Sequence, residues 1–359
     1  METKAFAPGR VEWLGNHTDY NQGFVLSAAL SSGINIEGKS RDDSLVVLHS
    51  DQFEGEYRVA IKDIAPIPEK HWANYVIGVV AEFLTADYDI SGFDATIHGD
   101  VPIGAGLASS AALEVATAFF LKKLNNLVID DLSLAKMAQS AEHNFAGVRC
   151  GLLDQISSIF SKEGKATFID FRSLEVKNIL VPEGYSLIIV NSGVKHALVA
   201  GEYNERRQSC ENAAKKLDKS FLRDVDSKEL NGKRDLLTEI EYKRAKHIVG
   251  ENERVLAAID ALEKSDIGAV GRLMFESHES SKKNFENSCS ELDFLVDAAS
   301  DIDGCVGARL SGGGFGGATI NLVESKLADS FINSIKKEYK NKYGKEPVVI
   351  VTVPSGGAR

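Results

Sequence analysis

Two glycine-rich segments have the composition of loops that bind phosphate. The first reads Gly104-Ala105-Gly106-Leu107-Ala108-Ser109-Ser110 and leads into a run with helical periodicity. Backbone N–H groups at a helix N-terminus can bind phosphate oxygens, and the serines there can cap the helix or coordinate Mg²⁺. A buried helix with a serine cap after a flexible turn is equally compatible with this spacing.

The second segment, Ser311-Gly312-Gly313-Gly314-Phe315-Gly316-Gly317, contains the pattern Gly-x-Gly-x-x-Gly. A dinucleotide-binding turn needs a strand before this pattern and a helix after it. Here the strand-like run 318–323 follows, so a Rossmann turn is excluded. Two interpretations of this segment remain: a turn packed against a ligand or another backbone, or a tight hairpin. The P-loop signature and the protein-kinase signatures are absent from the sequence, which excludes those kinase classes.

The elements that must position these segments follow from hydrophobic periodicity. Short apolar runs predict strands at 45–48, 93–97, 166–171, 187–190, 318–323 and 348–353. Helical periodicity predicts helices at 75–84, 109–121, 132–145, 202–217, 254–263 and 292–299. The polar stretch 218–246 is expected to be a solvated helical or loop excursion. Because strands and helices mix without a regular repeat, we expect an α+β architecture.

Composition limits the class of partner. The 359 residues are 43% hydrophobic and carry a net charge of −11, which favours a soluble protein of two domains that binds a small ligand. Nucleic acid and an anionic membrane are disfavoured as partners. The four cysteines form no C-x-x-C pair, and neither a leader-like segment nor a run of 18 apolar residues occurs. We therefore expect reduced thiols and a cytoplasmic location.

A third motif, Gly9-Arg10-Val11-Glu12-Trp13-Leu14-Gly15-Asn16-His17-Thr18-Asp19-Tyr20-Asn21, precedes both glycine-rich segments. In this order the three motifs resemble those of the GHMP kinases, and the first is similar to the galactokinase signature. Further blocks that resemble galactokinases lie at 72–75, 141–145, 150–155, 191–196, 202–207 and 277–280.

The resemblance implies an α+β, two-domain GHMP kinase fold with the active site in the interdomain cleft. Residues 1–185 would form an N-terminal domain, with a mixed sheet, helices and a left-handed crossover. Residues 186–359 would form a C-terminal α+β domain. The implied reaction transfers the γ-phosphoryl group of ATP to the anomeric hydroxyl of galactose. The implied partners are the sugar and ATP, bound by a monomer or weak oligomer.

The resemblance also implies a role for each matched residue. Asp154 would accept the sugar proton, and Arg10 would stabilise the developing charge. Ser110 and Glu142 would bind Mg²⁺. The implied sugar contacts are Asn16, His17, Thr18, Asp19, Gly151 and Tyr203. The phosphates of ATP would lie on Gly104, Ala105, Gly106, Leu107, Ala108, Ser109 and Ser110. The last of the family motifs along the chain lies near the sugar and the nucleotide. It would comprise Gly312, Gly313, Gly314 and Gly316.

Two positions depart from the galactokinase pattern, which has Asn where this chain has Glu12 and Glu where it has Asn16. In the family that Glu contacts the C6 hydroxyl of the sugar. An Asn removes one negative charge and adds two N–H donors. A kinase of a C6-modified sugar such as galacturonate is therefore an alternative to a galactose kinase.

The phosphate loop and its neighbours bear on a second alternative. Ala108 and Ser311 replace a family Ser and Thr, which leaves the fine position of ATP open. Some galactokinase-like proteins are non-catalytic sensors of sugar and ATP, and their phosphate loop is shortened. Here the loop has its full length and Arg10, Glu142 and Asp154 are present, so the enzyme is favoured over the sensor.

Overall fold

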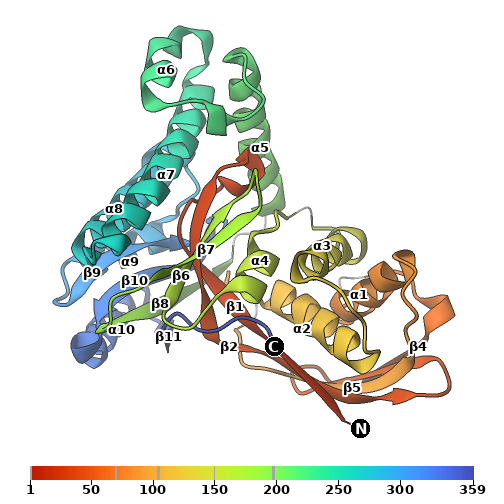
Figure 1. The fold of residues 1–359 in the computed structure, drawn as a ribbon. Helices are drawn as coiled ribbons and strands as arrows, with labels where there is room; N and C mark the ends of the chain where they lie inside the picture. The colour runs from red at the N-terminus through yellow and green to blue at the C-terminus, as the bar shows by residue number, and fades with distance from the viewer. Residues whose placement is uncertain (1, 69–70, 103–105, 149, 196–198) are drawn as a thin grey trace.

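The chain folds into two β-sheets with helices packed against them (Figure 1). The computed structural model describes residues 2–68, 71–102, 106–148, 150–195 and 199–359. The first sheet is built from the N-terminal half of the chain and the second from the C-terminal half.

The first sheet has seven strands in the described residues, in the order β4-β3-β5-β2-β6-β7, with β1 paired to β2. β3 and β5 are parallel neighbours, and the chain reaches β5 from β3 through β4 and α1. The handedness of this crossover stays a prediction. The strands are Thr3–Leu14 (β1), Phe24–Arg41 (β2), Leu45–Ser50 (β3), Glu56–Ala60 (β4), Gly92–Gly99 (β5), Lys165–Asp170 (β6) and Glu175–Leu180 (β7).

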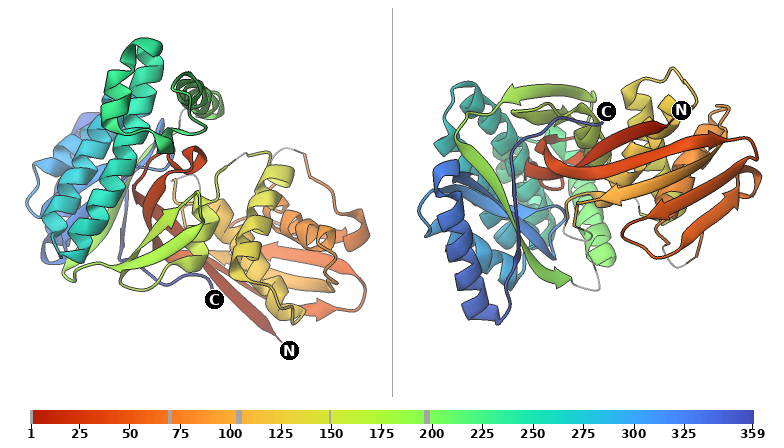
Figure 2. Two further views of the ribbon diagram at one scale, coloured as in Figure 1. Left: turned by 45° about the horizontal axis from the view of Figure 1, so that its top comes forward. Right: turned by 90° about the horizontal axis from the view of Figure 1, so that it is seen from below.

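Four helices cover one face of this sheet (Figure 2). The central one, α2, is buried from Ala111 to Leu121, which its nearly uninterrupted apolar sequence requires. Phe120 of α2 meets Phe93 of β5 with ring centroids 5.5 Å apart, inside the main hydrophobic core. The helices are Asn74–Thr85 (α1), Ser109–Leu124 (α2), Asp131–Ala141 (α3) and Leu153–Phe160 (α4).

The second sheet has the order β11-β8-β10-β9 and is antiparallel throughout. Its strands are Tyr185–Lys195 (β8), Cys305–Ser311 (β9), Gly316–Glu324 (β10) and Val348–Thr352 (β11). The helices of this half are Val199–Lys216 (α5), Ser227–Gly232 (α6), Glu239–Glu263 (α7), Ile267–Ser280 (α8), Ser290–Ser300 (α9) and Ala328–Tyr343 (α10). α8, α9 and α10 pack on the sheet, while α5, α6 and one end of α7 project from it (Figure 1).

A shared hydrophobic core joins the two halves. Trp13 of β1 and Leu26 of β2 are fully buried in the same cluster as Val255 of α7, Met274 of α8 and Ile320 of β10. The N-terminal strands therefore pack directly on C-terminal helices. This contact brings the end of the third motif, which lies between β1 and β2, next to α7.

The α+β fold class and all the predicted elements are confirmed, with shifted ends. The sequence prediction missed β1, β2, β4, β7, β9, α4, α8 and α10. It also placed the start of α7 too late, because the helix begins at Glu239, inside the polar stretch 218–246. The first sheet ends at Leu180 and the second begins at Tyr185, whereas a domain boundary at 185/186 stays a prediction.

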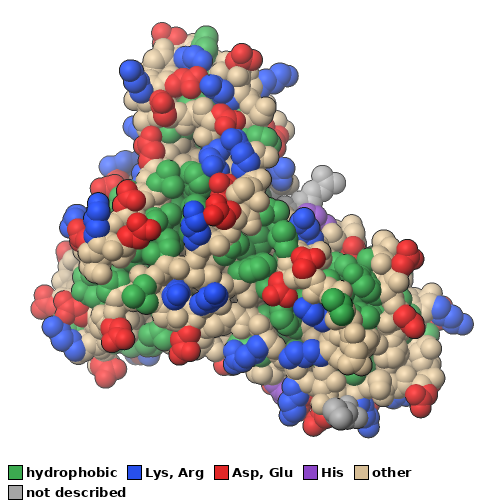
Figure 3. Space-filling model, viewed as in Figure 1, with side chains coloured by type: hydrophobic (Ala, Val, Ile, Leu, Met, Phe, Trp, Pro, Cys, Tyr) green, Lys and Arg blue, Asp and Glu red, His purple; other side chains and the backbone are tan. Residues whose placement is uncertain are grey.

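Acidic and basic side chains are interspersed over the face of the molecule drawn in Figure 3. Leu180 and Leu256 are among the large hydrophobic residues exposed on the surface, at 68% and 44%. Among the helices of the described chain, none combines the length and hydropathy that a membrane span requires.

Candidate active site

An ion pair between Arg10 and Asp154 lies at the centre of the site. Arg10 is on β1 and Asp154 is in the first turn of α4; Arg10 Nε donates to Asp154 Oδ1 over 2.7 Å. Arg10 Nη1 donates to the carbonyl of Gly106 over 2.7 Å. One guanidinium thus holds the carboxylate beside the glycine-rich loop.

The backbone reinforces this arrangement. The N–H of Arg10 donates to the carbonyl of Leu107 over 3.1 Å. A Cβ on the preceding Gly9 would lie 2.7 Å from that same carbonyl, so only glycine permits the loop to pack this closely on β1. The Gly-Arg pair of the third motif therefore fixes the position of the loop.

The N-terminus of α2 is available to an anion. The described part of the loop begins at Gly106, and the predicted phosphate contacts Gly104 and Ala105 lie outside the described residues. Ala108 has a left-handed conformation (φ 57°), and no side chain of the described chain caps the first turn. The serine-capped alternative is therefore not what α2 shows. The first backbone N–H groups of α2, which include those of Ser109 and Ser110, can bind phosphate.

Ser110 and Glu142, the two Mg²⁺ ligands that the resemblance implies, are in contact. Ser110 Oγ donates to Glu142 Oε1 over 3.2 Å. The other carboxylate oxygen accepts from Cys150 Sγ (3.0 Å) and Gln155 Nε2 (3.1 Å). Glu142 is only 6% exposed, and burial raises its pKa. A buried carboxylate beside a hydroxyl is a set of hard oxygen donors that suits a divalent cation.

A second buried carboxylate extends this cluster. Gln155 Nε2 also donates to Oε2 of Glu114 over 3.2 Å, and Glu114 is 0% exposed. Burial first, and then the nearby Glu142, raise the pKa of Glu114 well above its ordinary range. Gln155 thus joins two buried carboxyl groups whose pKa values are both raised.

The end of the third motif, residues 15–19, forms a tight loop between β1 and β2. His17 Nε2 lies 3.0 Å from the carbonyl of Gly313, and its Nδ1 lies 3.0 Å from Tyr20 Oη. Because a carbonyl only accepts, Nε2 carries the proton and Nδ1 accepts from the tyrosine hydroxyl. Burial lowers the pKa of His17 to about 4, so the imidazole is neutral. Thr18 Oγ1 donates to the carbonyl of Gly15 over 2.7 Å, which closes the loop.

Asp19, Gly151 and Tyr203 meet beside this loop. A Cβ on Gly151 would lie 1.9 Å from Asp19 Oδ2, so the segment that carries Asp154 passes directly against Asp19. The ring of Tyr203, on α5, lies 5.0 Å from that of His17. Burial raises the pKa of Asp19 to about 7, and Glu12 and Asp154 add to the shift. Hydrogen bonds donated by hydroxyl groups would stabilise the charged form of this buried carboxylate.

The second glycine-rich segment is a hairpin turn between β9 and β10, which confirms that it is not a Rossmann turn. The carbonyl of Gly312 accepts from Asn16 Nδ2 over 2.8 Å, while that of Gly313 faces His17. Gly314 has φ +84°, and a Cβ there would lie 2.1 Å from the carbonyl of Asn287. Gly316 begins β10. The turn thus packs against the loop at residues 15–19.

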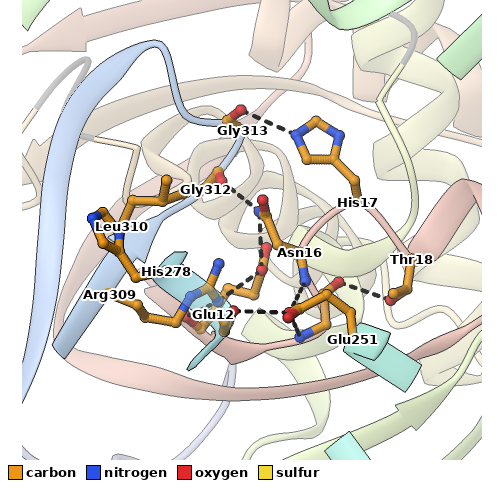
Figure 4. A network of polar contacts seen from close by, with 12 residues as sticks. Glu12, Asn16, His17, Thr18, Glu251, His278, Arg309, Leu310, Gly312 and Gly313 are labelled. Carbon is orange, nitrogen blue, oxygen red and sulfur yellow. Dashed lines mark hydrogen bonds and ion pairs between the residues drawn. The ribbon is translucent and has the colours of Figure 1, made fainter. Parts of the chain in front are cut away.

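The exchanged residues Glu12 and Asn16 belong to one buried network (Figure 4). Asn16 Nδ2 donates to Glu12 Oε1 over 3.2 Å, and Arg309 Nη1 donates to the same oxygen over 3.1 Å. Asn16 Oδ1 accepts from Asn287 Nδ2 over 2.8 Å. Arg309 is 0% exposed, and its Nε and Nη2 have no partner among the described residues.

The sequence prediction missed the C-terminal half of this network: Glu251, Asn287 and Arg309. Each lies more than 200 residues from the sugar motif, and none belongs to a motif that we singled out. Glu251 also precedes the helix that we predicted at 254–263. Only the fold brings these side chains to the loop.

Comparison with known proteins agrees with this geometry. The galactokinase galactose-binding signature matches residues 2–39, the GHMP kinases N terminal domain matches residues 74–162, and the GHMP kinases C terminal family matches residues 258–341. The fold and the site therefore define a GHMP kinase, an enzyme that transfers a phosphoryl group to an alcohol.

Full-length relatives narrow the assignment. A galactokinase of Chloroflexus aggregans is 40% identical over 98% of this chain and 92% of its own, and one of Bos taurus is 41% identical over 94% and 88%. A crystal structure of Lactococcus lactis galactokinase complexed with galactose covers 100% of this chain and 95% of its own, with a TM-score of 0.96 and 32% identity. The chain belongs to the galactokinase family.

Proposed function

We propose that this protein transfers the γ-phosphoryl group of ATP to the anomeric hydroxyl of galactose, giving galactose 1-phosphate and ADP. The observation that carries the proposal is the position of Arg10, which binds both Asp154 and the carbonyl of Gly106 at 2.7 Å. A carboxylate and a cation therefore lie together beside the glycine-rich loop, which supports a phosphoryl-transfer site. Positioning and charge stabilisation are the main requirements of phosphoryl transfer.

In the proposed reaction, Asp154 accepts the proton of the anomeric hydroxyl. The sugar oxygen forms its bond to the γ-phosphorus while the bond between that phosphorus and the β,γ-bridging oxygen breaks, and ADP leaves. Arg10 offsets the negative charge that develops on the transferred group. Asp19 accepts hydrogen bonds from sugar hydroxyls, and His17, Thr18, Gly151 and Tyr203 shape its surroundings.

We propose that Ser110 and Glu142 hold Mg²⁺ together with the phosphates of ATP. The 3.2 Å contact between their oxygens and the burial of Glu142 support this assignment. Mg²⁺ commonly uses one or two carboxylates and keeps substrate phosphates and waters as its other ligands. When bound, the ion neutralises phosphate charge. The segment from Gly106 to Ser110, which leads into α2, would bind the phosphate oxygens.

Galactose is favoured over galacturonate by the charges around the loop. Both N–H donors of Asn16 are engaged, by Glu12 and Gly312. Its amide oxygen already accepts from Asn287, so only the second lone pair of that oxygen is left for a sugar hydroxyl. Arg309 is fully buried and paired with Glu12, so this cation is withheld from a C6 carboxylate. Asp19 and Asp154 would repel an anionic sugar.

Catalysis is favoured over a sensor function because the proposed catalytic pair, Arg10 and Asp154, is hydrogen-bonded, and so is the proposed Mg²⁺-binding pair, Ser110 and Glu142. A cytoplasmic location agrees with the four cysteines, each of which is a free thiol. We keep a monomer or weak oligomer, with a small-molecule sugar and ATP as partners, as the proposed state.

A substrate panel tests the proposal. ADP release is measured with Mg²⁺ and ATP alone, and then with galactose, galacturonate or 6-deoxygalactose. We expect sugar-dependent ADP release with the highest kcat/KM for galactose. A higher kcat/KM for galacturonate would overturn the choice of sugar, and an absence of release with every sugar would support the sensor.

A further inference from the structure

We propose that Glu251 of α7 is a positioning residue for the sugar loop, residues 15–19, which it holds through the backbone N–H groups of Gly15 and Asn16. The inference rests on the proposed function in that this loop binds galactose. Glu251 is 0% exposed and acts on the sugar only through the loop.

Figure 4 shows the carboxylate of Glu251 beside Asn16, and each of its two oxygens accepts hydrogen bonds. Its Oε2 accepts from the N–H of Gly15 over 2.9 Å, from the N–H of Asn16 over 3.0 Å and from Ser277 Oγ over 3.0 Å. Its Oε1 accepts from Arg254 Nε over 2.6 Å. Hydrogen bonds from two consecutive backbone amides fix the chain direction at this point.

The surroundings keep this side chain ionised. Burial alone would raise the pKa of Glu251, but Arg254, His247 and Arg309, together with the N–H of Asn16, hold it well below its ordinary value. A carboxylate is a stronger acceptor from N–H groups than a neutral oxygen. The loop therefore remains anchored over the physiological pH range.

Two neighbours of Glu251 on α7 form hydrogen bonds at the two ends of the same loop. His247 lies one helical turn earlier, and its Nε2 is 3.2 Å from the carbonyl of Asn16. Asn252 Oδ1 accepts from the N–H of Phe24 over 2.9 Å, at the start of β2. One face of α7 thus binds the loop where it leaves β1 and where it enters β2.

The loop needs an anchor because its backbone takes an uncommon conformation at His17. His17, which is not a glycine, has φ 61°, whereas Gly15 reaches φ +100° without strain. Such conformations persist only where neighbouring contacts over-determine them. Without Glu251 the N–H groups of Gly15 and Asn16 would be buried without an acceptor, and the loop would shift. The phosphate side, with Arg10, has separate contacts and would stay in place.

The test separates sugar from nucleotide. Glu251→Ala is expected to lower kcat/KM for galactose by about 100-fold, with a rise in the KM for galactose, since a misplacement of an ångström costs catalysis about that much. Glu251→Gln keeps one acceptor oxygen and is expected to recover part of the loss, and both variants should keep the KM for ATP. Glu253→Gln is the matched control: Glu253 is exposed on the same helix, bonds Ser227 and should leave both KM values unchanged.

Amide hydrogen exchange gives a readout that does not depend on activity. In the wild type, the amides of Gly15 and Asn16 should exchange only on global unfolding, and in Glu251→Gln they should exchange faster while residues 106–112 stay protected. Fast exchange of both amides in the wild type would overturn the proposal even if the variants do not fold. An unchanged KM for galactose in Glu251→Ala, or equal rises in both KM values, would also overturn it. If the wild type does not phosphorylate galactose, the proposed function fails and the exchange result still judges Glu251.

Discussion

The side-chain amide of Asn16 donates to Oε1 of Glu12 over 3.2 Å, so the two residues exchanged relative to the family pattern form one hydrogen-bonded pair. Arg309 donates to the same carboxylate oxygen over 3.1 Å. One carboxylate and one amide therefore lie side by side at this place in the fold, and the carboxylate is paired with Arg309.

This pairing predicts strong coupling between the two positions. Asn16→Glu alone would place a second carboxylate against Glu12 and the carbonyl of Gly312, and should lower the free energy of unfolding by about 3 kcal/mol, as unpaired buried charges do. The double exchange Glu12→Asn with Asn16→Glu should recover most of that loss. Denaturant unfolding of the wild type, both single variants and the double variant measures the coupling; additive losses would contradict it.

Arg10 is predicted to need its planar guanidinium rather than only its charge. Lysine has one ammonium group and cannot donate to both Asp154 and the carbonyl of Gly106 in the same geometry. Arg10→Lys should lower kcat by about 100-fold, in the range known for lost transition-state donors. Steady-state kinetics with a thermal unfolding control measure this, and an unchanged kcat would count against the role of Arg10.

Gly151 is predicted to be essential for the sugar site alone. A Cβ there would lie 1.9 Å from Asp19 Oδ2, so Gly151→Ala must displace that carboxylate. We expect the KM for galactose to rise by about tenfold or more, with the KM for ATP unchanged. Gly232→Ala is the control, since a Cβ there meets no atom within 4 Å. Equal effects of the two variants would contradict the prediction.

The pH dependence should follow Asp19, whose pKa burial raises to about 7. Below that value the carboxyl is protonated and loses acceptor sites for sugar hydroxyls. The kcat/KM for galactose should therefore rise as pH increases through about 7. In Asp19→Asn this limb should disappear. A wild-type profile that is flat from pH 6 to 8 would contradict the assignment.

The raised pKa of Asp19 affects stability in the opposite direction: activity should rise with pH, whereas the stability of the fold should fall. The folded protein binds the Asp19 proton more tightly than the unfolded chain does, so ionisation of Asp19 destabilises the fold as pH rises from the ordinary value of 3.8 to about 7. Asp19→Asn removes this cost. We expect its Tm to exceed that of the wild type at pH 8 by more than at pH 5, which thermal unfolding without sugar can measure.

Glu142 is predicted to set the requirement for Mg²⁺. Glu142→Gln should raise the Mg²⁺ concentration for half-maximal activity by at least about tenfold, a loss reported even for residues that only orient metal ligands. Glu163→Gln, on an exposed turn, serves as the control. Chelation with EDTA should abolish wild-type turnover. A variant with an unchanged Mg²⁺ titration would contradict the assignment of this ligand.

The sequence predicted those elements that have a simple period. In the run 318–323 apolar and polar residues alternate, as they do in a strand of a sheet. The sequence of α2 is apolar around nearly its whole circumference, as in a buried helix. Both elements could therefore be identified from the sequence. β1 and β2 were not, because Pro8 and Gly33 interrupt them and because their buried faces change where the strands cross from one core to the other. Their length depends on tertiary packing rather than local pattern.

The candidate site divides in the same way. The motifs named Arg10, Asp154, Ser110 and Glu142, and the structure brings each pair together. Glu251 could not be predicted, because it is 235 residues from Asn16 along the chain and its role depends on how α7 crosses the sugar loop. A charged residue on a helix is by default exposed, and only the fold shows that this one is not.

The most direct test of the account compares the wild type with Asp154→Asn, using ³¹P NMR to identify the product formed from galactose, ATP and Mg²⁺. We predict galactose 1-phosphate from the wild type. The folded variant should bind galactose and ATP but turn over by at least about 1,000-fold less, within the range of an essential proton acceptor. Near wild-type turnover by Asp154→Asn, or a phosphate on any hydroxyl other than the anomeric one, would contradict the account.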